Sequence, residues 1–529
     1  MRIFLTLIYL LFFLYSSSQD NIVFNNNYKN DEGSGNWISS GMIIDGNDYV
    51  INGGYSVIMD NCSDVWTRGI CFIEIDSLGD ISNKKHFSFC NNTIYEGRNK
   101  SIIKNNNGYF ATSYKICSDT AISSIILFKL DNNLDTINTY EYFKDTTSKR
   151  AWGITSTYDD GFVIVGSNDT THSESNLTST YVELLMFKIN SNGDLIWHKK
   201  FDYQSSEDYS YNFGRNIIEC NNDDLVISGR TRQSEDVRKN IILKTDSLGN
   251  EKWHNIYGAG YDTPLFMDII ETRDSSILVC GAYTYGETFG GLYPYDGWLL
   301  KLNPDGTTVW NRKYREHTVN NSDWRDTIYC EFVSITELDD GGLAAIARVR
   351  STDCPCKDFK LYRMNSEGDT LWTKPFSSYP DGNILYYPNS ISQTADGGFA
   401  ISGYEDYYEW SDSSGWVSSQ QIFLIKTDSL GNDSLSYISE PQASPISRYE
   451  LEVYPNPASR QLHIKLPANF PGGDMQVINQ QGQIVNTIHL PRHKQSPAEL
   501  NVSSYPPGHY LLQIKARGYN YYGRFVKNQ

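Results

Sequence analysis

An internal repeat constrains the fold of this chain more than any other feature of its sequence. Two short phrases recur in fixed order at intervals of 55 to 63 residues. The first is a turn and an apolar run ending on a small residue, and its copies end at Gly53, Ser113, Gly166, Gly229, Gly281, Ala347 and Gly403. The second is an apolar run, a tight turn and another run, and its turns open at Asp76, Asp131, Asn190, Asp246, Asn303, Asn365 and Asp428.

Each copy contains about four runs of strand length, which we name strands A to D in chain order. Strand B carries the first phrase, and strands C and D carry the second. No stretch shows sustained helical periodicity. Because four short strands repeated seven times are typical of a β-propeller, the sequence predicts an all-β chain with a seven-bladed propeller over residues 19–438.

The last repeat lacks one of the recurring aromatic residues. Strand D carries an aromatic side chain eleven residues after the turn opens, at Phe87, Tyr142, Phe201, Tyr257, Tyr314 and Phe376, but the seventh copy has Ser439. Near the N-terminus, Phe24 and Tyr28 have the spacing of Trp253 and Tyr257. We therefore predict that residues 21–28 form the fourth strand of the last blade and cover its open edge. The alternative is that residues 433–438 form that strand.

A basic residue also recurs two positions before the second turn. It is found at Lys129, Lys188, Lys244, Lys301, Arg363 and Lys426, whereas the first copy has Glu74. Since it is present in all copies but one, we interpret it as part of the architecture, paired with a turn carboxylate, and not as a binding site.

The N-terminus has the pattern of a secretory signal peptide over residues 1–18. Arg2 precedes a near-continuous apolar stretch at 3–15, and Ser16, Ser17 and Ser18 supply small residues for cleavage. No later segment is apolar enough to predict a transmembrane span. The formal net charge of −18 disfavours nucleic acid and anionic membranes as partners.

The repeat stops at about residue 439. Residues 439–449 have the composition of a linker, and residues 450–529 hold short runs with alternating apolar positions, which predict a small β-sandwich. Four ordered motifs lie in this segment, at 454–458 (Tyr-Pro-Asn-Pro-Ala), 482–485 (Gly-Gln-Ile-Val), 508–510 (Gly-His-Tyr) and 525–527 (Phe-Val-Lys).

These motifs resemble the C-terminal sorting domain, type A-like, of the Bacteroidetes type IX secretion system. The resemblance implies that the secretion machinery is a partner, and that the protein passes through the periplasm to the cell surface or the medium. It assigns a sorting role to Pro455, Asn456, Pro457, Gly482, Gly508, Tyr510 and Lys527. An ordinary adhesive sandwich is the alternative. The propeller repeats are similar to the delta-60 or quinoprotein-like repeats of exported bacterial proteins, which implies the fold alone.

The connections between strands B and C vary most in length and composition. In a four-stranded blade these connections lie on one face, and variable loops on a rigid ring are common binding sites. Two of them, at 282–297 and 404–421, are rich in aromatic residues that can stack on sugars or anchor a protein. The candidate binding residues are Tyr283, Tyr285, Phe289, Tyr293, Tyr295, Tyr404, Tyr407, Tyr408, Trp410 and Trp416. The alternative is that these rings pack on one another to order the loops.

Nine cysteines leave at least one without a partner in the chain. Export permits disulfides, and the same geometry suggests Cys62–Cys71, which we place in one loop, and Cys90–Cys117. Cys330 could meet Cys354 or Cys356, while Cys220 and Cys280 are expected to be buried thiols.

Motifs for catalysis are hard to find. The sequence has no GxSxG, HExxH, P-loop or EF-hand pattern, so we predict no metal and no cofactor. The leading hypothesis is a non-catalytic binding or display module with a glycan or protein ligand. The alternative is an exported carbohydrate-active or quinoprotein-like enzyme, because a carboxylate pair for glycoside hydrolysis stays possible. A scaffold for the secretion machinery is a third reading.

Overall fold

The computed structural model divides the chain into two compact units, residues 1–438 and residues 439–529. The residues it describes are 23–28, 37–58, 66–89, 92–97, 100–106, 108–117, 122–170, 172–174, 177–203, 209–232, 238–258, 265–284, 295–315, 329–350, 357–376, 384–411, 415–433, 447–466, 473–479, 484–491, 497–516 and 519–528. Throughout these residues the regular structure is β-strand, and no helix has the length and hydropathy needed to cross a membrane.

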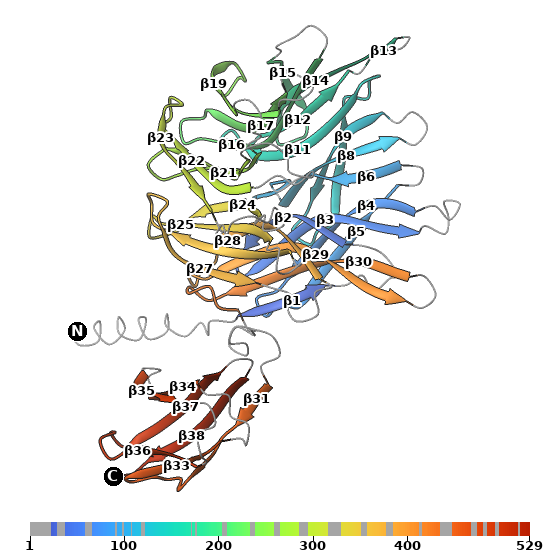
Figure 1. Cartoon of the computed structure of the whole chain (residues 1–529). Helices are drawn as coiled ribbons and strands as arrows, with labels where there is room; N and C mark the ends of the chain where they lie inside the picture. The colour runs from blue at the N-terminus through green and yellow to red at the C-terminus, as the bar shows by residue number, and fades with distance from the viewer. Residues whose placement is uncertain are drawn as a thin grey trace, which may run out of the picture. The chain divides into compact units, whose positions relative to one another are not determined.

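The first unit is built from successive antiparallel sets of strands (Figure 1). The first set is β2 (Trp37–Asp45), β3 (Asp48–Ile58), β4 (Trp66–Ile75) and β5 (Ile81–Phe87). The second is β6 (Asn92–Glu96) and β7 (Ile102–Asn105), both paired with β8 (Gly108–Cys117), then β9 (Ser123–Leu130) and β10 (Thr136–Tyr142). The third is β11 (Ser148–Ser156), β12 (Phe162–Asp169), β14 (Leu177–Ile189) and β15 (Leu195–Phe201), with β13 (His172–Glu174) paired to β14.

The later sets repeat this order. The fourth is β16 (Tyr209–Glu219), β17 (Leu225–Arg232), β18 (Arg238–Thr245) and β19 (Glu251–Tyr257), and the fifth is β20 (Leu265–Glu271), β21 (Ile277–Thr284), β22 (Tyr295–Leu302) and β23 (Thr308–Tyr314). The sixth is β24 (Tyr329–Glu337), β25 (Leu343–Arg350), β26 (Lys357–Met364) and β27 (Thr370–Phe376). The last is β28 (Ile384–Gln393), β29 (Phe399–Ser411), β30 (Gly415–Thr427) and β1 (Phe24–Tyr28). This arrangement is all-β and propeller-like.

The N-terminal strand completes the last set. β1 pairs antiparallel with β30, from Phe24 opposite Lys426 to Tyr28 opposite Ile422. In Figure 1 the blue β1 lies beside the orange β30. A core joins the last set to the first, because Ala400, Ile422 and Leu424 share one buried cluster with residues of β1 to β4. The prediction of N-terminal closure is therefore confirmed.

The recurring basic residue pairs with a carboxylate of the turn between strands A and B, as predicted. The distances from Nζ to Oδ2 are 2.6 Å for Lys188–Asp159, 3.3 Å for Lys244–Asp224, 2.8 Å for Lys301–Asp274 and 2.8 Å for Lys426–Asp396, and Arg363 pairs with Asp340. Lys129 differs, because its ammonium lies 5.5 Å from the Phe110 ring and donates to the Ser191 carbonyl oxygen at 3.4 Å.

The second unit consists of two sheets. One has the order β31 (Ser447–Glu450), β38 (Tyr519–Lys527), β37 (Gly508–Ala516), β34 (Gly473–Asn479) and β35 (Ile484–Leu490), and the other has the order β32 (Glu452–Tyr454), β33 (Gln461–Lys465) and β36 (Ala498–Asn501). Side chains of both sheets, including Leu462, Leu500, Leu512 and Phe525, form one buried core.

Candidate functional site

One layer of side chains follows directly after the small residue that ends each copy of the first phrase. In strand B the layer consists of Gly54, Tyr114, Ser167, Arg230, Ala282, Arg348 and Tyr404. Their cross-strand partners in strand A are Ile38, Tyr95, Arg150, Phe213, Leu265, Glu331 and Tyr387. We call these fourteen residues the variable layer. The layer lies at the end of strands A and B that is opposite the turn connecting them. Its residues differ from set to set, whereas the strand B position before it is always a small residue.

In the second set the variable layer holds two stacked tyrosines. The ring centroids of Tyr95 and Tyr114 are 5.1 Å apart, and the ring planes are 11° apart. The guanidinium carbon of Arg68 lies 5.1 Å from the Tyr95 ring, and that of Arg150 lies 6.0 Å from the Tyr114 ring. Such cation–π contacts fix the guanidinium groups against the aromatic faces.

A glycine makes room for the carboxylate beside this stack. Arg68 donates two hydrogen bonds to Glu96, from Nη2 to Oε1 at 2.5 Å and from Nε to Oε2 at 3.2 Å. A Cβ atom at Gly54 would lie 2.2 Å from Oε2 of Glu96. The absence of a Cβ atom at Gly54 therefore leaves the space that Glu96 needs to form this bidentate ion pair.

The last set repeats the arrangement. Tyr387 and Tyr404 stack with their centroids 4.7 Å apart and their planes 9° apart. The guanidinium carbon of Arg348 lies 5.8 Å from the Tyr387 ring, and its Nη1 lies 3.5 Å from Oε2 of Glu331. Burial raises the pKa of Tyr404 to about 12, with the Arg348 charge opposing that rise. The phenol thus stays protonated near neutral pH and can donate a hydrogen bond.

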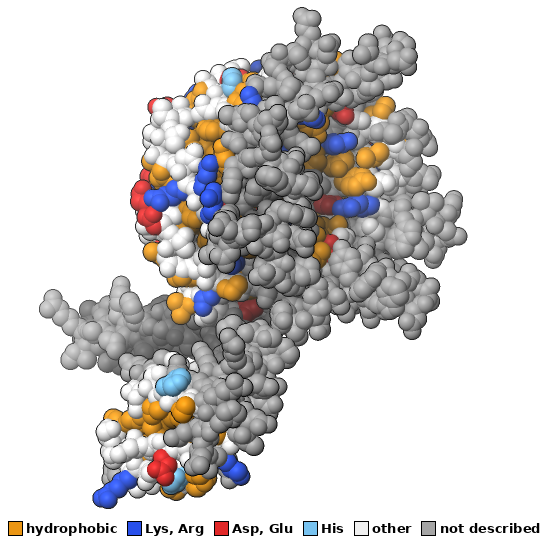
Figure 2. Space-filling model, viewed as in Figure 1, with side chains coloured by type: hydrophobic (Ala, Val, Ile, Leu, Met, Phe, Trp, Pro, Cys, Tyr) orange, Lys and Arg blue, Asp and Glu red, His pale blue; other side chains and the backbone are white. Residues whose placement is uncertain are grey.

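Further aromatic rings continue from the first stack into the third and fourth sets. The Trp152 ring lies 5.9 Å from Tyr114 and 6.1 Å from Phe213, and Phe213 meets Tyr211 edge to face at 5.7 Å. On the face in view in Figure 2, basic and hydrophobic side chains adjoin one another on the side where Figure 1 labels β4, β6 and β8.

An ion pair crosses the first unit deeper along the strands A. The ammonium of Lys100, between β6 and β7, lies 2.8 Å from Oδ1 of Asp268 in β20. Lys100 also donates to the Ile269 carbonyl oxygen at 2.6 Å. The other carboxylate oxygen of Asp268 accepts hydrogen bonds from the Ser334 hydroxyl at 2.9 Å and the Ile335 amide at 3.2 Å. The pair thus ties the second set to the fifth, three sets away.

Of the variable layer, only Tyr404 was predicted from the sequence as a binding residue. Arg68, Tyr95, Tyr114, Arg150, Arg348 and Tyr387 were missed. The signal that could have found Tyr114 and Arg348 is the position after each repeated small residue, where Gly, Tyr, Ser, Arg, Ala, Arg and Tyr replace one another.

The other residues predicted to bind a ligand lie outside the variable layer. Tyr283 lies in β21, where it meets Trp298 edge to face at 5.6 Å, and Tyr295 begins β22. Tyr407, Tyr408 and Trp410 lie in β29 and Trp416 lies in β30, while Tyr285, Phe289 and Tyr293 fall outside the described residues. The segment 404–421 is thus mostly a hairpin and not a loop, because its Tyr, Trp and Val residues favour extended strands.

The cysteines are only partly described. Cys71 is a free, fully buried thiol inside β4, so its predicted place in the loop with Cys62 is wrong: the side chain belongs to the core. Cys62 and Cys90 lie outside the described residues, and Cys117 ends β8. Cys220 and Cys280 are buried free thiols, as predicted.

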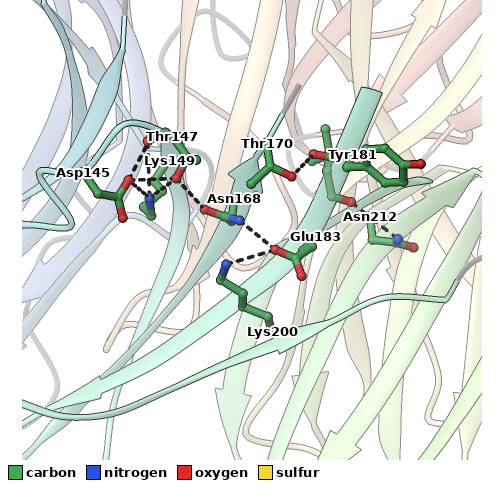
Figure 3. Close-up of polar contacts among 10 residues, drawn as sticks. Asp145, Thr147, Lys149, Asn168, Thr170, Tyr181, Glu183, Lys200 and Asn212 are labelled. Atoms are coloured by element: carbon green, nitrogen blue, oxygen red, sulfur yellow. Dashed lines mark hydrogen bonds and ion pairs between the residues drawn. The ribbon is translucent and has the colours of Figure 1, made fainter. Parts of the chain in front are cut away.

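Carboxylates of the first unit such as Glu183 are engaged by hydrogen-bond donors. Figure 3 shows one such row in the third set: Asn168 Nδ2 donates to Glu183 at 2.7 Å, and Lys200 lies 3.1 Å from the same carboxylate. The pKa of Glu219 is raised, and burial is the largest cause. Glu219 ends β16 at the turn end, opposite the variable layer. In the described residues no three His, Cys, Asp or Glu side chains are grouped to hold a metal ion.

The motif residues of the second unit meet at one place. Asn456 donates from Nδ2 to the Arg524 carbonyl oxygen at 3.0 Å and accepts from the Val526 amide at 2.9 Å. Tyr510 stacks on Phe525 at 5.2 Å, and Gly508 pairs with Lys527 across β37 and β38. Pro455 and Pro457 flank Asn456, and Gly482 lies outside the described residues. A cavity of about 270 Å³ is lined by Asn456, His509, Tyr510 and Arg524, among others.

Residues 452–528 match the family described as secretion system C-terminal sorting domain. The second unit is a C-terminal sorting domain. This confirms the resemblance to the type IX sorting domain, and with it export to the cell surface or beyond.

Comparison with other proteins adds nothing on the activity of the first unit. No curated protein matches the chain. The β-propeller domain of the Trilobed protease from Pyrococcus furiosus is similar, with 7% identity over 77% of this chain and 98% of that one and a TM-score of 0.40. A PL25 ulvan lyase has 6% identity over 78% and 96% of the two chains and a TM-score of 0.46. Likenesses this weak support no inference about function.

Proposed function

We propose that the first unit is a seven-bladed β-propeller that acts as a non-catalytic binding module, and that the sorting domain is a β-sandwich that takes it to the surface of a Bacteroidetes cell or into the medium. Each four-stranded set is one blade, and β1 closes the ring. Support comes from the regular strand order and from the core shared by the last and first sets. Closure removes the exposed edge that β30 would otherwise present.

The ligand, a glycan or a protein, binds at the variable layer and at the aromatic segments that continue from it. The observation that carries this proposal is the pair of tyrosine stacks, Tyr95–Tyr114 and Tyr387–Tyr404, each with an arginine beside it. Both stacks lie on paired strands, which hold them rigidly. Core packing does not explain why charged and aromatic side chains replace one another at a single position of an otherwise uniform repeat.

The carboxylates in and beside the layer favour binding over catalysis. Glu96 and Glu331 each face a guanidinium, at 2.5 Å from Arg68 and 3.5 Å from Arg348. A general acid for glycoside hydrolysis needs a raised pKa, and Glu219, whose pKa is raised by burial, lies at the other end of the strands.

A glycan and protein array probed with the intact secreted chain tests the proposal. We expect binding that Tyr404→Ala abolishes and that Tyr158→Ala, an exposed tyrosine in the turn between β11 and β12, leaves intact. Tyr404→Phe, which keeps the ring and the stack, is the control for misfolding. Binding that survives Tyr404→Ala, or turnover of a polysaccharide on the array, would overturn the proposal.

A further inference from the structure

We infer that the variable layer selects an anionic saccharide, a glycan with carboxylate or sulfate groups, and that Arg150 recognises its charge. This inference rests on the proposed binding function and names the ligand class. It starts from charge: the chain carries a formal net charge of −18, yet Arg150, Arg230 and Arg348 belong to the variable layer and Arg68 adjoins it. A local concentration of guanidinium groups on an acidic protein draws anions to that place.

Arg150 differs from the other arginines near the tyrosine stacks. Arg68 is bound to Glu96, and Arg348 faces Glu331. The described residues place no carboxylate against Arg150, and its buried Nε has no hydrogen-bond partner. The neighbouring Lys149 shows the contrast, since it is paired with Asp145.

A partly buried guanidinium without a counter-ion is an incomplete interaction. Its planar fork of N–H donors matches a carboxylate or a sulfate, which can accept two parallel hydrogen bonds. Arg150 lies in β11, and its guanidinium lies against the Tyr114 ring, so the donors are fixed before the ligand arrives. Preorganisation of this kind lowers the entropy cost of binding.

The aromatic rings around Arg150 favour a saccharide over an isolated anion. Trp152 lies two residues further along β11 and contacts Tyr114 on one side and Phe213 on the other. The Trp152 plane is inclined by 58° to that of Tyr114 and by 43° to that of Phe213, so the three rings form an aromatic group beside Arg150. The apolar C–H face of a pyranose can pack on aromatic side chains while its acidic group reaches the guanidinium.

Calorimetric titration of the intact chain tests the inference. The probes are trigalacturonate, its methyl ester, a sulfated galactan trisaccharide, maltotriose and a glutamate-rich peptide. We expect trigalacturonate or the sulfated probe to bind at least about tenfold more tightly than the uncharged probes, as one lost charge-assisted contact predicts. The stronger of the two acidic probes shows whether carboxylate or sulfate is recognised.

Substitutions of Arg150 test whether this residue recognises the charge of the ligand. Arg150→Gln should weaken the acidic probe about tenfold, Arg150→Lys should weaken it less, and neither should change the affinity for uncharged probes. Arg273→Gln is the matched control, because Arg273 is exposed near the opposite turns and pairs with Asp339. Equal affinity for trigalacturonate and its methyl ester, with Arg150→Gln indistinguishable from wild type, overturns the anionic assignment.

The same titrations distinguish failure of the charge assignment from failure of the proposed binding function. If maltotriose binds as tightly as the acidic probes and Tyr404→Ala abolishes that binding, the site stands and only the charge assignment is wrong. Preferential binding of the glutamate-rich peptide overturns the saccharide class in favour of an acidic protein. No binding of any probe, together with an empty array, contradicts both proposals.

Discussion

The hydroxyl of Tyr28 donates a hydrogen bond to the carbonyl oxygen of Gly79 at 2.8 Å. Tyr142 makes the same bond to Gly193 at 2.8 Å, and Tyr314 makes it to Gly368 at 2.5 Å. Each bond runs from the outer strand of one set to the turn between strands C and D of the next. Tyr28, near the N-terminus, thus joins the last set to the first as Tyr142 and Tyr314 join their own neighbours.

Removing this hydroxyl should weaken ring closure. Tyr28→Phe keeps the buried ring but leaves the Gly79 carbonyl without this donor, so we expect the free energy of unfolding to fall by about 1 kcal/mol. Urea unfolding followed by tryptophan fluorescence measures it, since all 11 Trp lie before residue 439. Tyr158→Phe removes an exposed hydroxyl that donates to Asn221 at 3.3 Å, and it should change the free energy of unfolding much less. Equal stability of Tyr28→Phe and wild type would contradict the role given to β1.

Removing Lys100 from its ion pair with Asp268 should destabilise the fold more than removing Asp268. The Asp268 side chain is 1% exposed and the Lys100 side chain is 33% exposed. Lys100→Met strands a buried carboxylate and should cost about 3 kcal/mol, whereas Asp268→Asn leaves an ammonium that water can reach. The double variant should recover part of the loss. Urea midpoints of the three variants decide it, and a larger loss for Asp268→Asn would refute the asymmetry.

Acid should destabilise the first unit through paired carboxylates. Burial opposes ionisation of Glu141, but Lys115 outweighs it with Ser124 and Lys144, and the pKa falls from 4.5 to about 2. At Asp145 burial is likewise outweighed by Lys149 and Thr147, and the pKa falls from 3.8 to about 2. Because both values are lowered by folding, their stabilisation is complete above about pH 5 and is lost as the pH falls towards 2.

Thermal melts between pH 6 and pH 2 measure this effect. The melting temperature should be level from pH 6 to pH 5 and should then fall. Glu141→Gln should be less stable than wild type at pH 6 and should show a shallower fall. Parallel curves for the two proteins would mean that Glu141 does not contribute.

The buried thiols should resist alkylation. Cys71, Cys220 and Cys280 are at most 1% exposed, and burial raises the pKa of Cys220 to about 12. Since the thiolate is the reactive form, iodoacetamide at pH 8 should leave these three residues unmodified in the folded chain and modify them in urea. Peptide mass spectrometry reads out each site. Rapid labelling of Cys71 in the folded chain would contradict its place in the core.

Much of the fold was predictable because repetition multiplies a weak signal. One apolar run cannot be assigned with certainty, but the same run at seven places fixes where each strand B ends. Ser439 stands where the other copies have an aromatic residue, and Phe24 and Tyr28 have the spacing of a strand D. Together these features predicted closure by the N-terminal strand, and the register of β1 with β30 confirms it. The pairs of Lys188, Lys301 and Lys426 with turn carboxylates were predictable for the same reason.

The candidate site was harder to predict because it consists of departures from the repeat. Arg68 and Glu96 come from neighbouring sets, and only the packing of β4 on β6 reveals their ion pair over Gly54. Lys100 and Asp268 are 168 residues apart and meet only when the strands A face one another. Cys71 was misplaced because a strand that follows a variable loop has no sharp beginning in the sequence.

Hydrogen–deuterium exchange of the intact chain, with and without a glycan that binds it, tests the central claim that the variable layer is the binding site. Peptides that cover 110–117, 226–232, 344–350 and 400–406 should exchange more slowly in the bound state. Peptides that cover the opposite turns at 157–161, 272–276 and 338–342 should not change. Protection confined to those turns, or to the sorting domain, would contradict the claim.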